Sequence, residues 1–376
     1  MGTLFDYITW RGDLTFEADP LNEVDNLIFS LISYIDFGGI VSSRHATDPV
    51  SLQAAANSFF SRNPDRSKVS IGLIIPKEII KLFDALRDSR RFRSVRVKAY
   101  TNLIDLKKEM QFSAITFVLP TGETVVAYRG TDDTIVGWKE NFNMSFMDVI
   151  PSQKAAALYL DMAAKYSQGP IYVTGHSKGG NLSVYAGTYC SDATKERIVR
   201  VWSNDGPGFA NGLPESEAYL DMKPRIRTLI PQSSVVGMLL EHDKSYTVVK
   251  SRQTGVLQHN GLTWEVEGNS FVHLKDVSGE CVRTDRNLQE WIRGMTPEQR
   301  EQFSDAIYQI LSADNALTLT QLMSPKNRWI LESLKLDPQV RRTIRRTLRE
   351  LIGINAKNLF SGSAPKGGAA EEQSKR

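Results

Sequence analysis

The chain has 376 residues, of which 41% are hydrophobic and 24% charged, a composition that excludes wholesale disorder. Its 46 Lys and Arg residues against 43 Asp and Glu residues give a formal net charge of +3, which does not favour nucleic acid as the main partner. The only two cysteines, Cys190 and Cys281, lie far apart without metal-ligand spacing, a usage typical of a reducing compartment.

The N-terminus does not show the pattern of a basic start followed by an apolar core, so we expect no signal peptide. No apolar run reaches the ~18 residues that a membrane-spanning helix needs. These features predict a cytoplasmic protein.

Residues 1–68 are predicted to form a helical N-terminal segment that packs on the core. A stripe at helical spacing would bury one face of a helix over residues 22–34. Its members are Val24, Leu27, Ile28, Leu31 and Ile32.

Residues 69–284 are predicted to form an α/β core. The predicted strands are 95–100, 114–119, 123–129, 171–174, 198–203 and 226–230, and the predicted helices begin at Pro151 and Lys178. The first of these helices carries Ala155, Leu158, Tyr159, Met162, Ala163 and Tyr166 on one side. Strands that alternate with helices in this way indicate a sheet with helices on both faces.

Residues 285–360 are predicted to be helical, and residues 361–376 to be a disordered tail. Thr296-Pro297-Glu298-Gln299 has the pattern of a capping box and predicts a helix start. Further on, arginines cluster on one predicted helix, where they could contact anionic lipid headgroups or simply face water. They include Arg341, Arg342, Arg345 and Arg346.

The pentapeptide Gly175-His176-Ser177-Lys178-Gly179 carries the strongest chemical signal. It matches G-x-S-x-G, follows a predicted strand and opens a predicted helix, which is the context of a nucleophile elbow. Small flanking residues permit the sharp turn that would expose the Ser177 hydroxyl, and the helix start offers free N–H groups to an oxyanion. A tightly packed turn or a phosphate-holding turn is the alternative.

A second run, Val125-Val126-Ala127-Tyr128-Arg129-Gly130-Thr131 followed by Trp138 and Asn141, resembles the class 3 lipases. Most of the chain is more similar to a bacterial family of lipase-like α/β-hydrolases. That resemblance rests on Asp6-Tyr7, Trp10-Arg11-Gly12-Asp13-Leu14, Asn22-Glu23-Val24-Asp25, the elbow with Gly180-Asn181, Asn204-Asp205-Gly206-Pro207-Gly208-Phe209 and Gln258-His259. It implies the α/β-hydrolase fold and a hydrolase activity, without a substrate.

The resemblance to class 3 lipases implies that Thr131 donates its backbone N–H to the oxyanion, although Thr131 could also be a plain turn residue. The second donor would be the backbone N–H of Lys178. The side chain of Lys178 could bind an acidic substrate group or face solvent.

A serine nucleophile needs a general base, most often histidine. His259 lies in a polar loop after the predicted sheet strands and fits the order Ser–acid–His of α/β-hydrolases. It is our first candidate, and His242 is the second.

The acid departs from the lipase pattern, because Ser234 stands where the class 3 lipases have aspartate. Asp205 follows the strand 198–203 and is the preferred replacement, although its carboxylate could merely shape a turn. Asp243 is the alternative acid.

These residues predict a serine hydrolase that cleaves a carboxylic ester or thioester through an acyl-enzyme on Ser177, with no metal and no cofactor. Three alternatives stay open, one of them a peptidase, although nothing in the sequence suggests a peptide groove. An acyltransferase could use the same serine, and a catalytically silent scaffold would account for the missing aspartate at position 234.

Overall fold

A mixed sheet forms the centre of the computed structural model, which describes residues 1–322 except 73–74, 211, 244, 280, 284–285, 287–289, 291–293 and 313–315. Within that part of the chain the sheet has nine strands in the order β1-β2-β3-β4-β5-β6-β7-β8-β11. Their bounds are Val50–Ser51, Arg96–Asp105, Met110–Val118, Thr124–Tyr128, Ile171–His176, Ile198–Asn204, Ile226–Pro231, Tyr246–Val249 and His273–Leu274. A separate hairpin pairs β9 (Val266–Glu267) with β10 (Ser270–Phe271).

The strands β4 to β8 run parallel, whereas β1 to β4 and the pair β8–β11 are antiparallel. The carboxyl ends of β5 and β6 therefore lie at the same edge, where His176 pairs with Asn204 in register. In open sheets with parallel strands, ligands bind at this edge.

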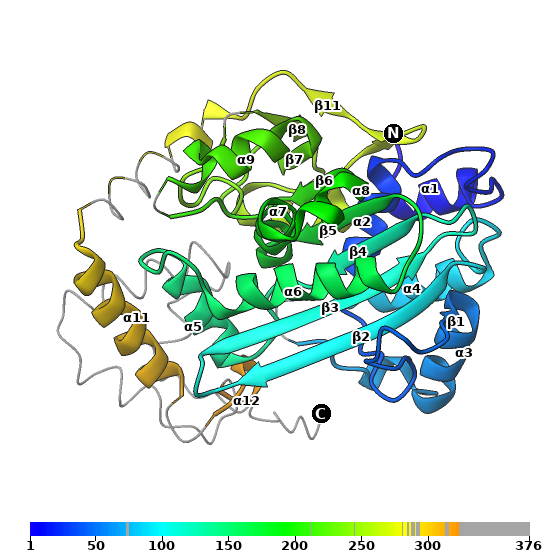
Figure 1. Cartoon of the computed structure of the whole chain (residues 1–376), viewed down its shortest axis with the longest axis horizontal. Coiled ribbons are helices and arrows are strands. Elements are labelled where there is room, and N and C mark those ends of the chain that lie inside the picture. The colour runs from blue at the N-terminus through cyan, green and yellow to red at the C-terminus, as the bar shows by residue number, and fades with distance from the viewer. Residues whose placement is uncertain are drawn as a thin grey trace, which may run out of the picture.

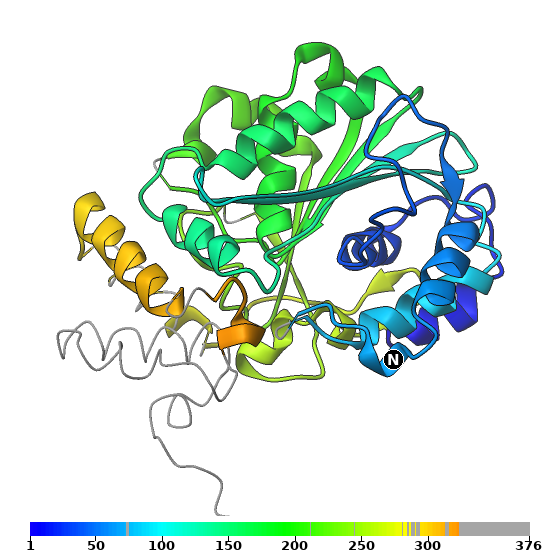
Figure 2. The ribbon, with the colours of Figure 1, turned by 90° about the horizontal axis from the view of Figure 1, so that it is seen from below.

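Both faces of the sheet are covered, as Figure 2 shows edge-on. Strand β4 illustrates the alternation: Val125 and Ala127 belong to one buried core, and Val126 and Tyr128 to the core on the opposite face. The predicted α/β fold with helices on both faces is confirmed.

The N-terminal helices α1 to α4 cover one face of the sheet and share a buried core with its strands. Their bounds are Leu4–Arg11, Glu23–Ile32, Leu52–Arg62 and Glu78–Asp88. The prediction that α2 buries one face was wrong, because every residue from Val24 to Ile32 is buried. Its polar residues Asp25, Asn26 and Ser30 are accommodated by hydrogen bonds inside the protein.

The opposite face carries α6 and α7, and Figure 1 shows α6 lying along the long β2–β3 hairpin. The remaining helices of the core are α5 (Ile135–Asn143), α6 (Pro151–Lys165), α7 (Lys178–Tyr189), α8 (Asp192–Arg197) and α9 (Glu217–Met222). Short 3₁₀ turns cover Arg66–Lys68, Leu213–Glu215, Lys223–Arg225, Gly255–His259 and Gly261–Thr263.

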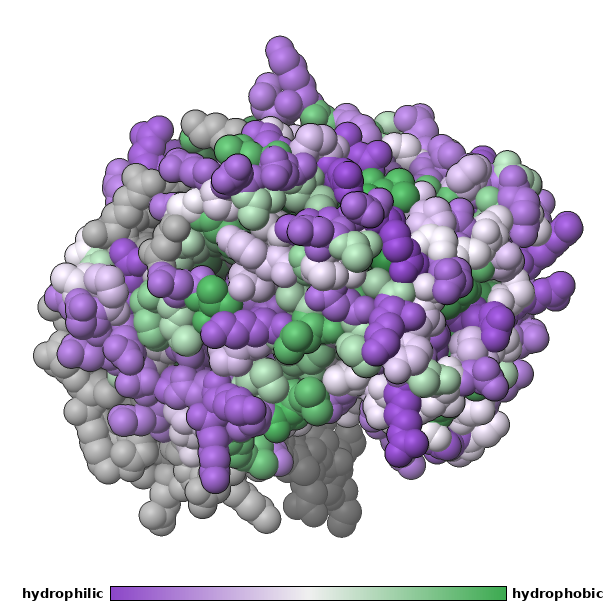
Figure 3. All heavy atoms as spheres, viewed as in Figure 1, coloured by the Kyte–Doolittle hydropathy of each residue, from purple (hydrophilic) through white to green (hydrophobic). Residues whose placement is uncertain are grey.

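The predicted apolar side of α6 was only partly right. Tyr159 and Ala163 are buried, but Leu158 is 68% exposed and Met162 is 41% exposed. The surface in Figure 3 is mostly hydrophilic, with apolar residues gathered over α6 and the β2–β3 hairpin.

After the core, α11 (Pro297–Leu311) packs on α5, and α12 (Leu319–Leu322) follows. The capping box is confirmed, since Thr296 and Gln299 each accept a hydrogen bond from the other's backbone N–H. The arginines 341, 342, 345 and 346 and the predicted tail 361–376 lie outside the described residues. Among the residues that are described, no helix combines the length and apolar character required to cross a membrane.

Candidate active site

Ser177 lies at a sharp turn between the end of β5 at His176 and the start of α7 at Lys178. Its φ of 60° and ψ of −132° are strained for a residue with a side chain, as a nucleophile elbow requires. The flanking glycines are needed for close packing: a Cβ on Gly175 would lie 2.0 Å from the carbonyl oxygen of Gly179. The local sequence therefore builds the predicted elbow.

The elbow is fastened to the neighbouring strand β6. The Ser177 N–H donates to the carbonyl oxygen of Asn204 at 3.0 Å. The Asn204 side chain in turn binds Asn26 and Ser30 of the buried helix α2. The polar side chains of α2 thus hold the two strand ends that carry Ser177 and Asp205.

His259 and Asp205 are in direct contact: His259 Nδ1 lies 2.6 Å from Asp205 Oδ2. Asp205 is fully buried and has a φ of 50°, which turns its carboxylate out of the end of β6. Its other oxygen, Oδ1, accepts from the Ser234 hydroxyl and from the Gly237 N–H at 3.2 Å. Ser234 therefore binds Asp205, the aspartate that pairs with His259.

The His259 loop is held from two sides. Gln258 accepts from the Ser233 N–H at 2.9 Å through its side chain and from Trp264 Nε1 at 2.9 Å through its carbonyl. The rings of His259 and His176 lie 4.6 Å apart, and His176 Nε2 donates to the His259 carbonyl at 2.7 Å. Burial, followed by the nearby His259, lowers the pKa of His176 to about 3. His176 therefore stays neutral beside the candidate base.

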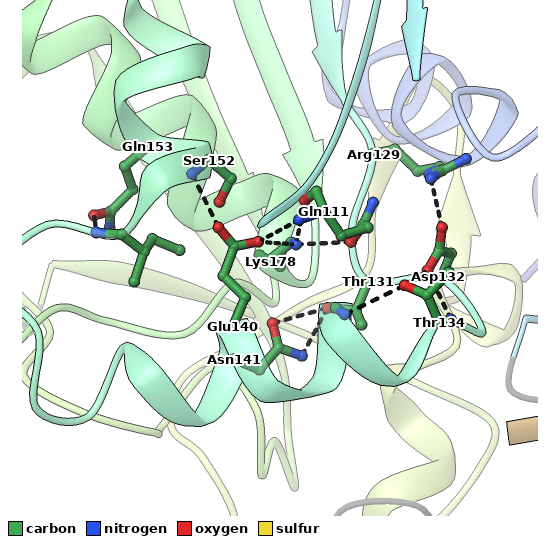
Figure 4. A network of polar contacts seen from close by, with 12 residues as sticks. Gln111, Arg129, Thr131, Asp132, Thr134, Glu140, Asn141, Ser152, Gln153 and Lys178 are labelled. Carbon is green, nitrogen blue, oxygen red and sulfur yellow. Dashed lines mark hydrogen bonds and ion pairs between the residues drawn. The ribbon is translucent and has the colours of Figure 1, made fainter. Parts of the chain in front are cut away.

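Thr131 lies in the loop after β4, next to the elbow. A Cβ on the preceding residue, Gly130, would be 3.1 Å from Ser177 Cβ, so this loop packs directly on the candidate nucleophile. Asn141 of α5 holds the Thr131 hydroxyl, with Nδ2 at 2.6 Å (Figure 4). The Trp-x-x-Asn motif that follows Arg-Gly-Thr thus anchors the threonine.

The Lys178 side chain follows neither predicted alternative. It is 1% exposed, and its ammonium pairs with Glu140 Oε2 at 2.9 Å. It neither faces solvent nor reaches toward a substrate, because α5 and β3 enclose it.

His242 and Asp243 lie apart from the elbow contacts. Asp243 pairs with Lys223 at 2.7 Å, and this partner lowers the pKa of Asp243 despite the opposing effect of burial. His242 Nδ1 contacts the Leu240 carbonyl at 3.3 Å. The structure brings Asp205, and not Asp243, to His259.

Neither Ser177 Oγ nor His259 Nε2 has a hydrogen-bond partner among the described residues. The structure thus joins the candidate base to the candidate acid, but it shows no bond between nucleophile and base. Such bonds are often loose before substrate is bound.

Sequence reasoning assigned no role to two polar residues of the site. Glu140 pairs with Lys178, and Asn181 of α7 donates to the Gly208 carbonyl at 2.7 Å in the loop after Asp205. The signal that could have found Asn181 was its place in the Gly-Gly-Asn run that ends the elbow.

Solved structures with similarity to this chain include lipases. A Rhizomucor miehei lipase–propeptide complex is 14% identical with a TM-score of 0.34, over 53% of this chain and 66% of that chain, just under two thirds of it. M37 lipase is 16% identical with a TM-score of 0.35, over 56% and 68% of the two chains. A triacylglycerol lipase from Penicillium expansum is 12% identical with a TM-score of 0.30, over 48% and 74%.

The α/β fold rests on the sheet topology described above and not on these matches. No curated protein matches the chain. Residues 86–309, more than half of the chain, match the sequence pattern of the Mbeg1-like family, and the chain belongs to that family.

Proposed function

We propose that the protein is a serine hydrolase that cleaves a carboxylic ester through an acyl-enzyme on Ser177. His259 is the general base, Asp205 orients it, and the backbone N–H groups of Thr131 and Lys178 bind the oxyanion. A thioester with an exposed acyl carbonyl is a substrate of the same chemistry.

The contact that carries this proposal is the 2.6 Å pairing of His259 Nδ1 with the buried carboxylate of Asp205. It fixes the tautomer that leaves Nε2 free to accept a proton, and it stabilises the imidazolium that results. A turn-shaping aspartate would bond its own backbone instead.

In the proposed reaction the three residues act in turn. Ser177 Oγ attacks the ester carbonyl carbon while His259 takes the hydroxyl proton, and the carbonyl oxygen becomes an oxyanion between the two N–H groups. Collapse of this intermediate breaks the C–O bond to the alcohol, which receives the proton from His259. Water repeats the sequence and releases the carboxylic acid.

Labelling with a fluorophosphonate tests the proposal, because the reagent phosphonylates only an activated serine. We expect the intact mass of the wild-type chain to rise by one adduct, and Ser177→Ala and His259→Ala to remain unlabelled. His242→Ala is the matched control and should label like wild type.

A folded wild-type chain that takes up no reagent would support the silent scaffold instead. If labelling occurs, ester hydrolysis in the presence of an added alcohol separates hydrolase from acyltransferase by whether the acid or the transferred ester accumulates.

A further inference from the structure

A fully buried ion pair lies beside the elbow and is not needed by the mechanism above. Lys178 is 1% exposed and Glu140 is 0% exposed. The Lys178 ammonium donates to the Gln111 carbonyl at 2.6 Å, to Gln111 Oε1 at 2.7 Å and to Glu140 Oε2 at 2.9 Å. All three of its N–H groups are thereby used.

Glu140 binds residues near the starts of three further elements, as Figure 4 shows. Its Oε2 also accepts from the Gln111 N–H in β3 at 3.0 Å, and its Oε1 accepts from the Ser152 N–H at the start of α6 at 2.9 Å. The carboxylate therefore connects α5, β3, α6 and, through Lys178, the first residue of α7.

The sequence neighbours of the two partners are the groups that matter for an oxyanion. Lys178 directly follows Ser177, and its own N–H is one proposed donor. Glu140 directly precedes Asn141, which holds Thr131, the second proposed donor. The two donors come from chain segments far apart in sequence. The ion pair links α7, which begins with Lys178, to α5, whose Asn141 holds Thr131.

We propose that Lys178 and Glu140 are a positioning pair that sets the separation and direction of the two oxyanion-hole N–H groups. This inference rests on the proposed hydrolase function. Neither charged side chain touches the substrate. The pair acts by fixing α5, and hence Thr131, relative to the elbow.

Stability alone does not require charges here. Two apolar residues of similar volume in place of a buried ion pair are often neutral or stabilising, whereas removal of one partner strands a buried charge at a cost of about 3–5 kcal/mol. The labelling rate of the folded double apolar variant therefore separates the two roles: it falls if the pair sets position, and it stays at the wild-type value if the pair serves stability alone.

The experiment compares Lys178→Met/Glu140→Leu with wild type by Tm, by the second-order rate constant of fluorophosphonate labelling, and by the pH dependence of that rate. The phosphonyl oxygen occupies the oxyanion position, so the rate reports on both N–H groups. Asp305→Asn is the matched control, because it removes a carboxylate that pairs with Lys139 on the other side of α5 at 2.7 Å.

We expect the double variant to have a lower Tm than wild type, because the Gln111 and Ser152 N–H groups lose their acceptor. At a temperature where it is folded, it should label about 10–100-fold more slowly than wild type, a loss comparable to that of a displaced oxyanion donor. The pH midpoint should not move, because His259 and Asp205 are untouched. Asp305→Asn should label at the wild-type rate.

A folded double variant that labels as fast as wild type overturns the positioning role and leaves the hydrolase intact. If the double variant does not fold, Glu140→Gln replaces it, since the amide keeps the shape of the side chain but not its charge. Its labelling rate is then compared with that of wild type well below the Tm of the variant. An unlabelled wild-type chain overturns the hydrolase function itself, and the positioning role with it.

Discussion

The two sides of the Ser177 elbow differ in the charge of the side chains that hold them in place. On the acid side, the groups that contact the Asp205–His259 pair are neutral: Ser234, the Gly237 N–H and an uncharged His176. On the side proposed to bind the oxyanion, the buried Lys178 and Glu140 hold the elements together. On the side proposed to move a proton, the contacts among the described residues are neutral, and a fixed charge there would shift the protonation of the proposed base. The side that only aims N–H dipoles can use an ion pair.

The largest effect should come from removing the single charge on the acid side. Asp205→Asn keeps the shape but allows the wrong His259 tautomer, so we expect the labelling rate to fall by about 10⁴-fold. Stopped-flow or manual labelling kinetics measure it, and Asp243→Asn is the control with an expected wild-type rate. A loss of less than tenfold in Asp205→Asn would remove Asp205 from the site.

A smaller effect should come from the oxyanion side. Asn141→Ala releases the Thr131 hydroxyl but leaves its N–H in place, so we expect a loss of about tenfold, below the 10²–10³ for a donor that is removed. Thr131→Val cuts the same bond from its other end. A double-mutant cycle on the labelling rate should show that the two losses do not add, and additive losses would contradict the anchoring role.

Ser234→Ala tests whether neutral donors suffice to hold the acid. Loss of this hydroxyl removes a hydrogen bond to a buried carboxylate, so the free energy of unfolding should fall by about 1.5–3 kcal/mol, with only a several-fold loss of labelling rate. Urea unfolding measures the first quantity. Ser233→Ala is the adjacent control, because the Ser233 hydroxyl contacts the Ser278 hydroxyl at 2.8 Å and not Asp205.

The smallest effect concerns the neutrality of His176. Its folded pKa of about 3 lies below the ordinary value of 6.5, so the unfolded chain binds a proton that the folded chain excludes. Its contribution to stability is therefore complete above about pH 6.5 and declines by about 1.4 kcal/mol per pH unit as the pH falls toward 3.

His176→Gln, which keeps a donor for the His259 carbonyl, should show a shallower decline than wild type in urea unfolding between pH 6.5 and 5. If stability declines equally with pH in wild type and variant, the pKa of His176 is the same in the folded and the unfolded chain.

Much of the fold was open to sequence reasoning because its signals are local. The strands 171–174, 198–203 and 226–230 lie within β5, β6 and β7, and the capping box at Thr296 starts α11. The stripe on α6 misled because apolar periodicity does not state which residues a neighbouring element covers. Leu158 has the right spacing and yet faces water.

The candidate site residues could be proposed from the sequence as far as each had its own local motif. Ser177 stands in a pentapeptide, and the contact of His259 with Asp205 agrees with the order of residues along the chain. The burial of Lys178 was not predictable, because its partner Glu140 is 38 residues away in a helix that no pattern had indicated. Charged residues are rarely buried, and only the pair makes it possible.

The contacts between residues 317–319, at the start of α12, and the loop after Thr131 have a consequence for the order of synthesis. Ile135 donates to the Leu317 carbonyl, Leu319 donates to the Asp133 carbonyl, and Thr134 bridges Thr318. A ribosome makes this loop long before it makes the segment that clamps it. The residues proposed as nucleophile, acid and base all precede this segment in the chain, so the contacts that hold the loop after Thr131 are the last of this group to become available during synthesis.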